Sequence, residues 1–195
     1  MGNIISDVIL LNNFEPVSTK CTRMSIRSIF IFCVLSSLFV NRSDAQVEDV
    51  DITSVRQVIH TMFEGMRLGD SAMVSQVFYP KAQFFSAFMT PQGESKLNQG
   101  SVQDWLNAIG TPHEQVWNEE WWDPSIKVDG NFAHAWTPYA FYVDDTFSHC
   151  GVDSFHFVKD DQGSWKVFHA TDTHRKANCD TFIPDYIKAK HASKN

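Results

Sequence analysis

Apolar residues downstream of residue 50 first follow a helical spacing. They recur mostly three or four positions apart over 51–68, and so form one face of a helix: Ile52, Val55, Ile59, Met62, Phe63 and Met66. Gly69 stands where a glycine commonly follows a helix. Ser71 is expected to cap a second, short helix that Pro80 stops, and Ser101 with Asp104 resembles the capping box of a third helix.

The pattern then changes to strands. Residues 81–89 are aromatic and β-prone, and after residue 110 four longer strands are expected: 114–128, 131–143, 146–159 and 164–175. Asp123-Pro124 predicts a bend in the first of these, Asp129-Gly130 a hairpin and Asp144-Asp145 a tight turn. Helices that come early and an antiparallel meander that comes late predict an α+β domain with the helices on one face of the sheet.

The region before residue 46 is typical of a targeting signal. Residues 29–40 form one apolar run, Arg27 precedes it, and Ser43-Asp44-Ala45 supplies small residues two apart after it. We therefore expect residues 1–45 to be a leader with its true start at Met24, cleaved near Ala45 from an exported (periplasmic or secreted) protein. The run is too short to span a bilayer, and the alternative is a buried core helix. Residues 46–180 would then be the domain and 181–195 a C-terminal tail.

Composition narrows the class of partner. The chain has 195 residues, of which 43% are hydrophobic, enough for one domain with a packed core. It carries 23 acidic against 16 basic residues and a net charge of −7, without a basic run, which argues against nucleic acid as a partner. Neither a metal-binding motif nor a glycine-rich phosphate loop is present, so neither a metal nor a cofactor is expected.

Several segments together carry a resemblance to a known family. A long helix that ends at Gly69-Asp70, followed by a bent sheet that ends in Gly163-Ser164-Trp165-Lys166-Val167, resembles the nuclear transport factor 2-like superfamily. Segments 136–142, 147–153 and 172–179 are similar to its bacterial lumazine-binding-like or SnoaL-like subgroup. The resemblance implies a cone-shaped fold, in which a curved antiparallel sheet wraps the N-terminal helices and leaves a pocket at its open end. His174 departs from the arginine expected after Asp-Thr in that subgroup.

Strand parity predicts which side chains face this pocket. A two-residue turn at Asp144-Asp145 pairs Trp136 with Asp153 and His134 with Phe155. Matching Trp165 with Phe157 in the last strand then puts His169 beside Asp153. The candidate acid–base residues are therefore Asp153, His169 and His149. The candidate ligand-binding residues are His134, Trp136, Tyr139, Phe155 and Trp165.

Structural roles compete with each of these assignments. His134 and His149 are equally well read as core histidines, and an Asp153–His169 contact as a purely structural hydrogen bond. The tryptophans at 117, 121 and 122 are better explained as part of the core or of a dimer surface than as part of a ligand site. A single β-bulge reverses the face of the sheet to which every later side chain of its strand points. The assignment of pocket residues therefore depends on strand pairing without bulges.

Two further features concern covalent and subunit contacts. Cys150 and Cys179 are a natural disulfide pair in an exported protein, the alternative being two buried thiols. Phe168 and Ala170 point away from the pocket by parity, and an apolar outer face predicts a homodimer.

The pocket composition and the implied fold favour a small-molecule-binding domain for a small hydrophobic or aromatic ligand. The alternative is an enzyme of the isomerase, dehydratase or cyclase type that uses an Asp–His pair for acid–base work. A third hypothesis is a module without a pocket that makes only protein contacts.

Overall fold

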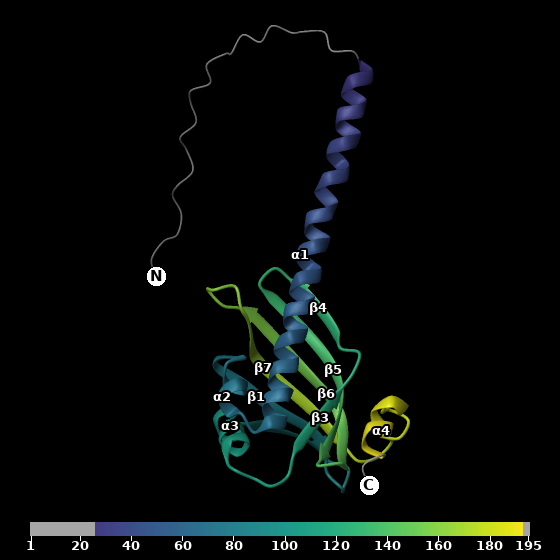
Figure 1. Ribbon diagram of the computed structural model, residues 1–195. Coiled ribbons are helices and arrows are strands. Elements are labelled where there is room, and N and C mark those ends of the chain that lie inside the picture. Colours follow the sequence, from purple (N-terminus) through teal and green to yellow (C-terminus); the bar gives the residue numbers. More distant parts are fainter. Residues whose placement is uncertain (1–25, 193–195) are drawn as a thin grey trace, which may run out of the picture. The chain divides into compact units, whose positions relative to one another are not determined.

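The computed structural model describes the backbone of residues 26–192, and the side chains of Gln46 and residues 48–192. Two compact units divide the chain, residues 1–42 and residues 43–195. Of the first unit, the described part is helical backbone. The proposed start at Met24 and the rest of residues 1–25 lie outside the described residues, as do the side chains of the leader up to Ala45. The order of the elements is shown in Figure 1.

Helix ends follow the local capping signals. Helix α1 (Ile26–Leu68) ends where predicted: Gly69 donates to the Met66 carbonyl at 3.1 Å and Asp70 to the Gly65 carbonyl at 2.8 Å, with Gly69 at φ 69°. The cap of α2 (Ser71–Ser75) is Asp70 rather than Ser71. The predicted Ser101 cap of α3 (Val102–Gly110) is present, and α4 (Asp185–Ala192) lies in the expected tail.

No helix in the described part of the chain is long and apolar enough to cross a membrane.

Seven strands form one curved sheet in the order β2-β1-β7-β6-β5-β3, with β4 also paired to β5. All neighbours are antiparallel except β1 and β7, which run parallel. The predicted bent strand at 114–128 is two strands, β3 and β4, and β2 was not expected because its residues are all exposed and polar in pattern. The strands are β1 (Phe78–Met89), β2 (Ser95–Gly100), β3 (Trp117–Trp121), β4 (Ser125–Asp129), β5 (Phe132–Val143), β6 (Thr146–Lys159) and β7 (Trp165–Arg175).

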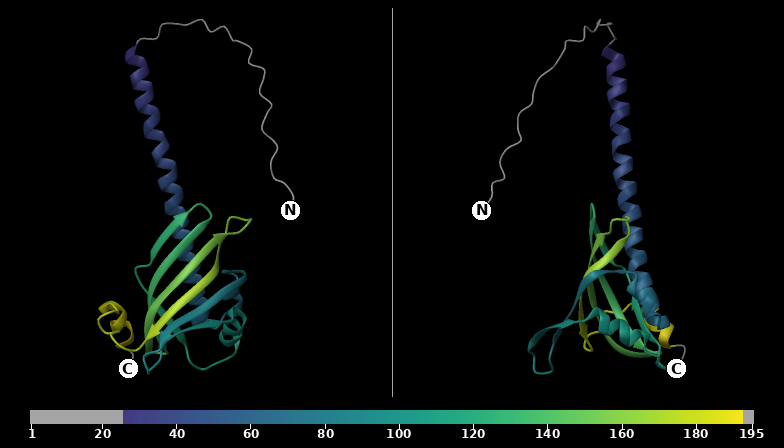
Figure 2. Two further views of the ribbon diagram at one scale, coloured as in Figure 1. Left: turned by 180° about the vertical axis from the view of Figure 1, so that it is seen from behind. Right: turned by 90° about the vertical axis from the view of Figure 1, so that its left-hand side faces the viewer.

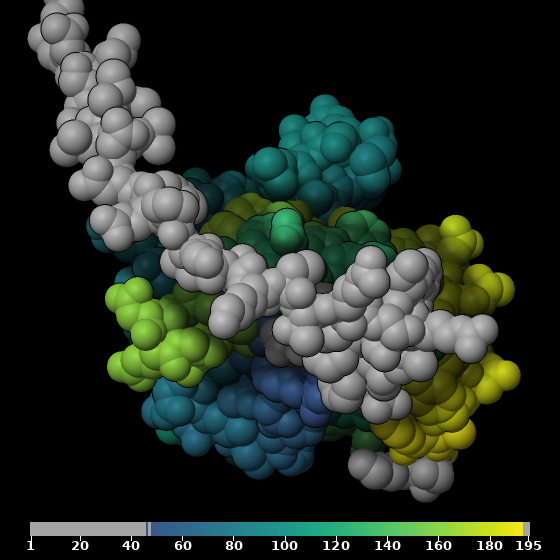
Figure 3. Space-filling model, turned by 90° about the horizontal axis from the view of Figure 1, so that it is seen from above, coloured from purple at the N-terminus to yellow at the C-terminus, as the bar shows by residue number. Residues whose placement is uncertain are grey.

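The main core lies between α1 and the concave face of the sheet (Figures 1 and 2). The predicted helical face is buried there, including Val55, Ile59 and Phe63, against Phe157 and Val167 of the sheet. The β1–β2 hairpin stands away from this core and forms the teal projection in Figure 3. The α+β cone expected from the sequence is therefore the observed fold.

A buried polar contact also ties α1 to the sheet. Asp51 Oδ1 accepts a hydrogen bond from Trp165 Nε1 at 3.2 Å and pairs with Lys159 Nζ at 2.7 Å. Lys159 in turn lies 5.0 Å from the centre of the Trp165 ring. Trp165, predicted to bind ligand, is only 4% exposed and belongs to this core contact.

Two β-bulges change the predicted register. Val143 pairs with Thr146 and Tyr142 with Phe147 as expected, but the next pair is Phe141 with His149, so Ser148 is an extra residue. From there on, Thr137 and not Trp136 opposes Asp153. A second bulge in β7 moves the pairing from Phe157–Val167 to His156–His169, with Phe168 as the extra residue. Each bulge shifts the side-chain alternation by one residue relative to the neighbouring strand.

A second, smaller core lies under α4. It contains Ile183, Ile187, Tyr142, Cys150 and Cys179. The structure joins the two cysteines by a disulfide, with the Cα atoms 5.9 Å apart. The segment that follows Cys179 is therefore held on the convex face of the sheet instead of forming a free tail.

The shifted register removes part of the reason for the expected homodimer, which rested on Phe168 and Ala170 both facing outward. Ala170 faces the inside of the sheet and is 3% exposed, whereas Phe168 faces outward beside Phe132 and His156. The homodimer itself stays a prediction.

Candidate functional site

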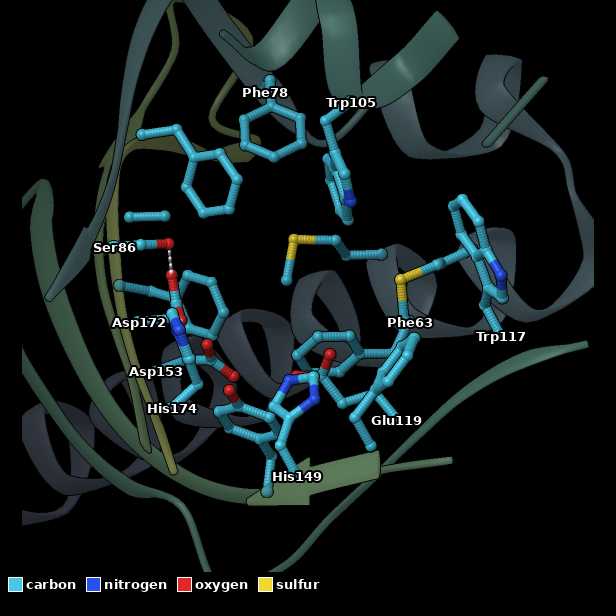
Figure 4. A pocket seen from close by; sticks show the side chains of 17 residues that line it. Phe63, Phe78, Ser86, Trp105, Trp117, Glu119, His149, Asp153, Asp172 and His174 are labelled. Carbon is cyan, nitrogen blue, oxygen red and sulfur yellow. Dashed lines mark hydrogen bonds and ion pairs between the residues drawn. The ribbon is translucent and has the colours of Figure 1, made fainter. Parts of the chain in front are cut away.

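A cavity of about 530 Å³ opens where α1 ends inside the sheet. Its walls come from α1, α3 and five strands, and they are mostly aromatic and aliphatic (Figure 4). Rings of Phe78 and Trp105 form one side, and the polar side chains gather on the other. The complete lining is Met62, Phe63, Met66, Phe78, Phe84, Ser86, Trp105, Trp117, Glu119, Tyr139, Phe141, His149, Asp153, Phe155, Ala170, Asp172 and His174. An apolar cavity with a few convergent polar groups is typical of a small-molecule site.

Three carboxyl groups meet in the polar part of the cavity: Glu119 from β3, Asp153 from β6 and Asp172 from β7. Asp153 and Asp172 are direct partners in the β6–β7 ladder, so their side chains lie on the same face. Glu119 reaches the cavity because it opposes Phe141 of β5, another lining residue. Three acidic side chains from three strands thus share one small apolar space.

Burial dominates the ionisation of two of these groups. It raises the pKa of Glu119 to about 8, with the charge of Asp172 adding to the shift and a hydrogen bond to Asp153 opposing it. Burial also raises the pKa of Asp153 well above its usual range, and the neighbouring Glu119 and Asp172 raise it further. A neutral Asp153 that donates to Glu119 is the arrangement these shifts favour.

Asp172 is held in a different environment from the other two carboxyls. Ser86 donates a hydrogen bond to its Oδ1, and His174 Nδ1 lies 3.2 Å from its Oδ2. The His174 ring stacks on Phe88 with the ring centres 4.9 Å apart, which fixes the imidazole beside the carboxylate. Asp172 and His174 therefore form an oriented pair at the cavity wall.

His149 and Tyr139 complete the polar side. The His149 ring stacks on Phe141 with centres 5.1 Å apart, and its Nδ1 lies 3.0 Å from the Ser148 hydroxyl. Burial lowers the pKa of His149 and the nearby His174 lowers it further, so the imidazole is neutral at neutral pH. Tyr139 donates its hydroxyl proton to the Thr173 carbonyl at 2.9 Å, and burial raises its pKa. Tyr139 therefore acts as a fixed wall of the cavity.

The structure brings only part of the predicted site together. Asp153, His149, Tyr139 and Phe155 line the cavity. The predicted partner of Asp153, His169, is instead on the outer face, where its ring lies 5.2 Å from that of His156. The Phe168 bulge is the physical reason, since it reverses the facing of all later residues in β7.

Two predicted ligand-binding residues are also misplaced, by the bulge at Ser148. His134 pairs with His156 and its Nε2 lies 3.1 Å from the Ser154 hydroxyl, while Trp136 is 49% exposed. Both therefore belong to the outer face of the sheet, and the prediction that they bind ligand is wrong for this cavity.

Four polar residues of the cavity were missed: Ser86, Glu119, Asp172 and His174. Strand parity assigned Asp172 and His174 to the outside, and nothing in the sequence marks the bulge that turns them in. The sequence could have identified Glu119 as a pocket residue. It lies two positions from both Trp117 and Trp121, so in a strand its side chain points to the same, inward face as theirs. Within the described residues, no group of three or more His, Cys, Asp or Glu side chains is arranged to hold a metal ion.

Comparison with known proteins agrees with this architecture. Residues 50–171, more than half of the chain, match the model of a family described as "Putative lumazine-binding". The chain belongs to this family. No curated protein sequence matches the chain.

Solved structures described as NTF2-like share the fold of this lumazine-binding-like chain. An NTF2-like protein of unknown function from Shewanella baltica shares 18% identity with it over 65% of this chain and 95% of its own, with a TM-score of 0.50. A protein of unknown function from Mycobacterium tuberculosis shares 13% over 80% and 89%, with a TM-score of 0.55. A structure from Novosphingobium aromaticivorans, described as a "Putative Scytalone Dehydratase", shares 12% over 65% and 85%, with a TM-score of 0.50. At these identities the likeness shows the fold alone.

The raised pKa of Glu119 predicts that folding stability falls as pH rises. The contribution of the neutral carboxyl is complete below the usual glutamate pKa of the unfolded chain, and it is lost as pH rises through about 8. Between about pH 5 and pH 9 we expect Glu119→Gln to remove on the order of 2 kcal/mol of this decline. Urea denaturation across that range measures it.

The exposed Glu114→Gln is the matched control and should keep the wild-type pH dependence. An equal slope for the wild type and Glu119→Gln would contradict the buried, neutral Glu119.

Proposed function

We propose that the domain binds a small, mostly apolar molecule in the cavity, with one polar group of that molecule placed against Glu119, Asp153 and Asp172. The description of the family supports ligand binding in general terms, and the cavity supports it for this chain. A volume of about 530 Å³ is within the range of small-molecule pockets. The hypothesis of a module without a pocket receives no support from this geometry.

The observation that carries the proposal is the state of Asp153. Asp153 is 7% exposed and lines the cavity, and its buried Oδ2 has no hydrogen-bond partner among the described residues. A buried polar atom without a partner costs free energy that a bound molecule can recover. The cavity thus offers an apolar surface and one unsatisfied polar position at the same place.

A bicyclic neutral probe tests the binding. We expect 2-naphthylmethanol to raise the melting temperature of the wild-type protein and to change its tryptophan fluorescence, because Trp105 and Trp117 line the cavity. Ser86→Phe fills part of the cavity and should weaken binding at least about tenfold. Ser95→Phe, in the exposed strand β2, is the matched control and should bind as the wild type does. A wild-type protein that does not respond to the probe would overturn the proposal.

A second candidate is acid–base catalysis of the isomerase or dehydratase type. It is favoured by the placement of the Asp172–His174 pair beside Glu119 and Asp153, which have raised pKa values. Titratable groups whose environments separate their pKa values can divide the acid and base roles between them. In this hypothesis one group removes a proton from carbon and another protonates the adjacent oxygen.

Deuterium exchange tests this second candidate without a known substrate. In D₂O the wild-type protein should exchange the enolisable protons of 2-tetralone faster than buffer does, and Asp153→Asn should reduce the enzymatic rate by at least about tenfold. Nuclear magnetic resonance follows the loss of the proton signal. A wild-type rate equal to that of buffer leaves binding as the function.

We also propose export, with the leader removed near Ala45. The run 29–40 and the small residues before Gln46 support it, and so does the Cys150–Cys179 disulfide, since disulfides persist mainly in oxidising compartments. Protein recovered from the periplasm or medium of the producing cells should begin at Gln46 by intact mass and lack two protons for the bridge. An N-terminus at Met1 or Met24 would contradict this proposal.

A further inference from the structure

We propose that the polar group of the bound molecule is a protonated amine, so that the cavity recognises an organic cation with an aromatic or alicyclic body. This inference rests on the proposed binding function and specifies the charge of its ligand. It follows from the carboxyl groups that line the cavity, from the Asp153 Oδ2 atom, which has no hydrogen-bond partner, and from the aromatic rings of the lining.

Only one of the three carboxyl groups in the described lining of the cavity, that of Asp172, has a basic partner there, His174. Glu119, Asp153 and Asp172 all face the cavity, and none of the lining residues is a lysine or an arginine. The two imidazoles do not supply a free cation: His149 is neutral for the reason given above, and His174 is engaged with Asp172.

The lysines and arginines of this region lie outside the described lining of the cavity. Arg67 and Lys190 border a separate hollow beside Glu119. They are paired there with Glu64 and Glu120.

Arg175 lies over the ring of Phe182 at 4.4 Å, on the side of the C-terminal segment. Lys176 follows the end of β7, and like Arg175 it acts on the site only through its distant charge. A cationic ligand would therefore meet two carboxyl groups, those of Glu119 and Asp153, that have no basic partner in the described lining.

The shape of the cavity suits an ammonium group at one end and a ring system at the other. The buried Oδ2 of Asp153 has no hydrogen-bond partner, and an ammonium group has three N–H donors, enough to reach more than one carboxyl. Opposite the carboxyls stand the rings of Trp105 and Phe78, and Phe63 lies beside Glu119 (Figure 4). Aromatic rings attract cations and also pack against apolar groups, so they strengthen the preference for a cation with an apolar body.

The protonation of the site distinguishes a cation from other ligands. A neutral molecule can bind while Glu119 and Asp153 stay neutral, and an anion would be repelled by any ionised carboxyl of the lining. An ammonium group favours the ionised form of the carboxyls beside it, so its binding releases a proton from Glu119 or Asp153 to solvent. Proton release on binding is thus a signature that only the cation produces.

Three probes with one naphthyl body and different charge test the inference: 2-naphthylmethylamine, 2-naphthylmethanol and 2-naphthoate. Isothermal titration calorimetry at about pH 7 in phosphate and in Tris gives the affinity and the number of protons released. We expect the amine to bind at least about tenfold more tightly than the alcohol. The naphthoate should bind weakest, and only the amine should release a substantial fraction of a proton.

Asp153→Asn and Glu119→Gln should each reduce the preference for the amine while the alcohol still binds. The exposed Asp161→Asn is the matched control and should keep that preference. Equal affinity for amine and alcohol, or amine binding by the wild type without proton release, would overturn the cation inference and leave the proposed function intact. If none of the three probes binds the wild type, the proposed function fails with it. The proton count uses the wild type, so it decides the matter even if a variant does not fold.

Discussion

The packing of one apolar helical face into a curved sheet is the contact on which the rest of the domain depends. Val55, Ile59 and Met62 fill the concave face of β5, β6 and β7, and Asp51 fixes the helix at one end through Trp165 and Lys159. The sheet continues past the point where α1 ends at Leu68, so the helix does not fill it completely. The cavity is the space left between the last turns of α1, helix α3 and the sheet.

The cavity is costly to the protein in the absence of a ligand. Three carboxyl groups lie in a largely apolar space, and burial keeps Glu119 and Asp153 mostly neutral at neutral pH. A core designed only for stability would place hydrophobic residues at these positions, because an unpaired buried acid destabilises the fold. Strain of this kind is commonly retained where a ligand or a reaction uses it. The same groups support simple binding, acid–base chemistry and, in our inference, selection of a cation.

Much of the fold follows from local sequence signals. The spacing from Val55 to Met66, the glycine at 69, the Ser101 cap and the turn at Asp144-Asp145 all predict elements that the structure contains. Strand β2 escaped prediction because an exposed edge strand needs no apolar pattern. Of the predicted site residues, Asp153, His149 and Phe155 line the cavity because they lie on β6, whose inward face the apolar residues define. Tyr139 also lines it, because the bulge at Ser148 turns its side chain inward.

The sequence by itself determined most of the elements and their order, and which two cysteines were available to form a bridge. Of the three acids of the pocket it indicated only Asp153. Tertiary structure decided which side chains enter the pocket. One extra residue at Ser148 and another at Phe168 turned Trp136 and His169 outward and Asp172 and His174 inward. The alternation along a strand is a local property, but the register between strands is set by the hydrogen bonds and packing of the whole sheet. A bulge therefore has no mark in a single sequence, although it decides the chemistry of the site.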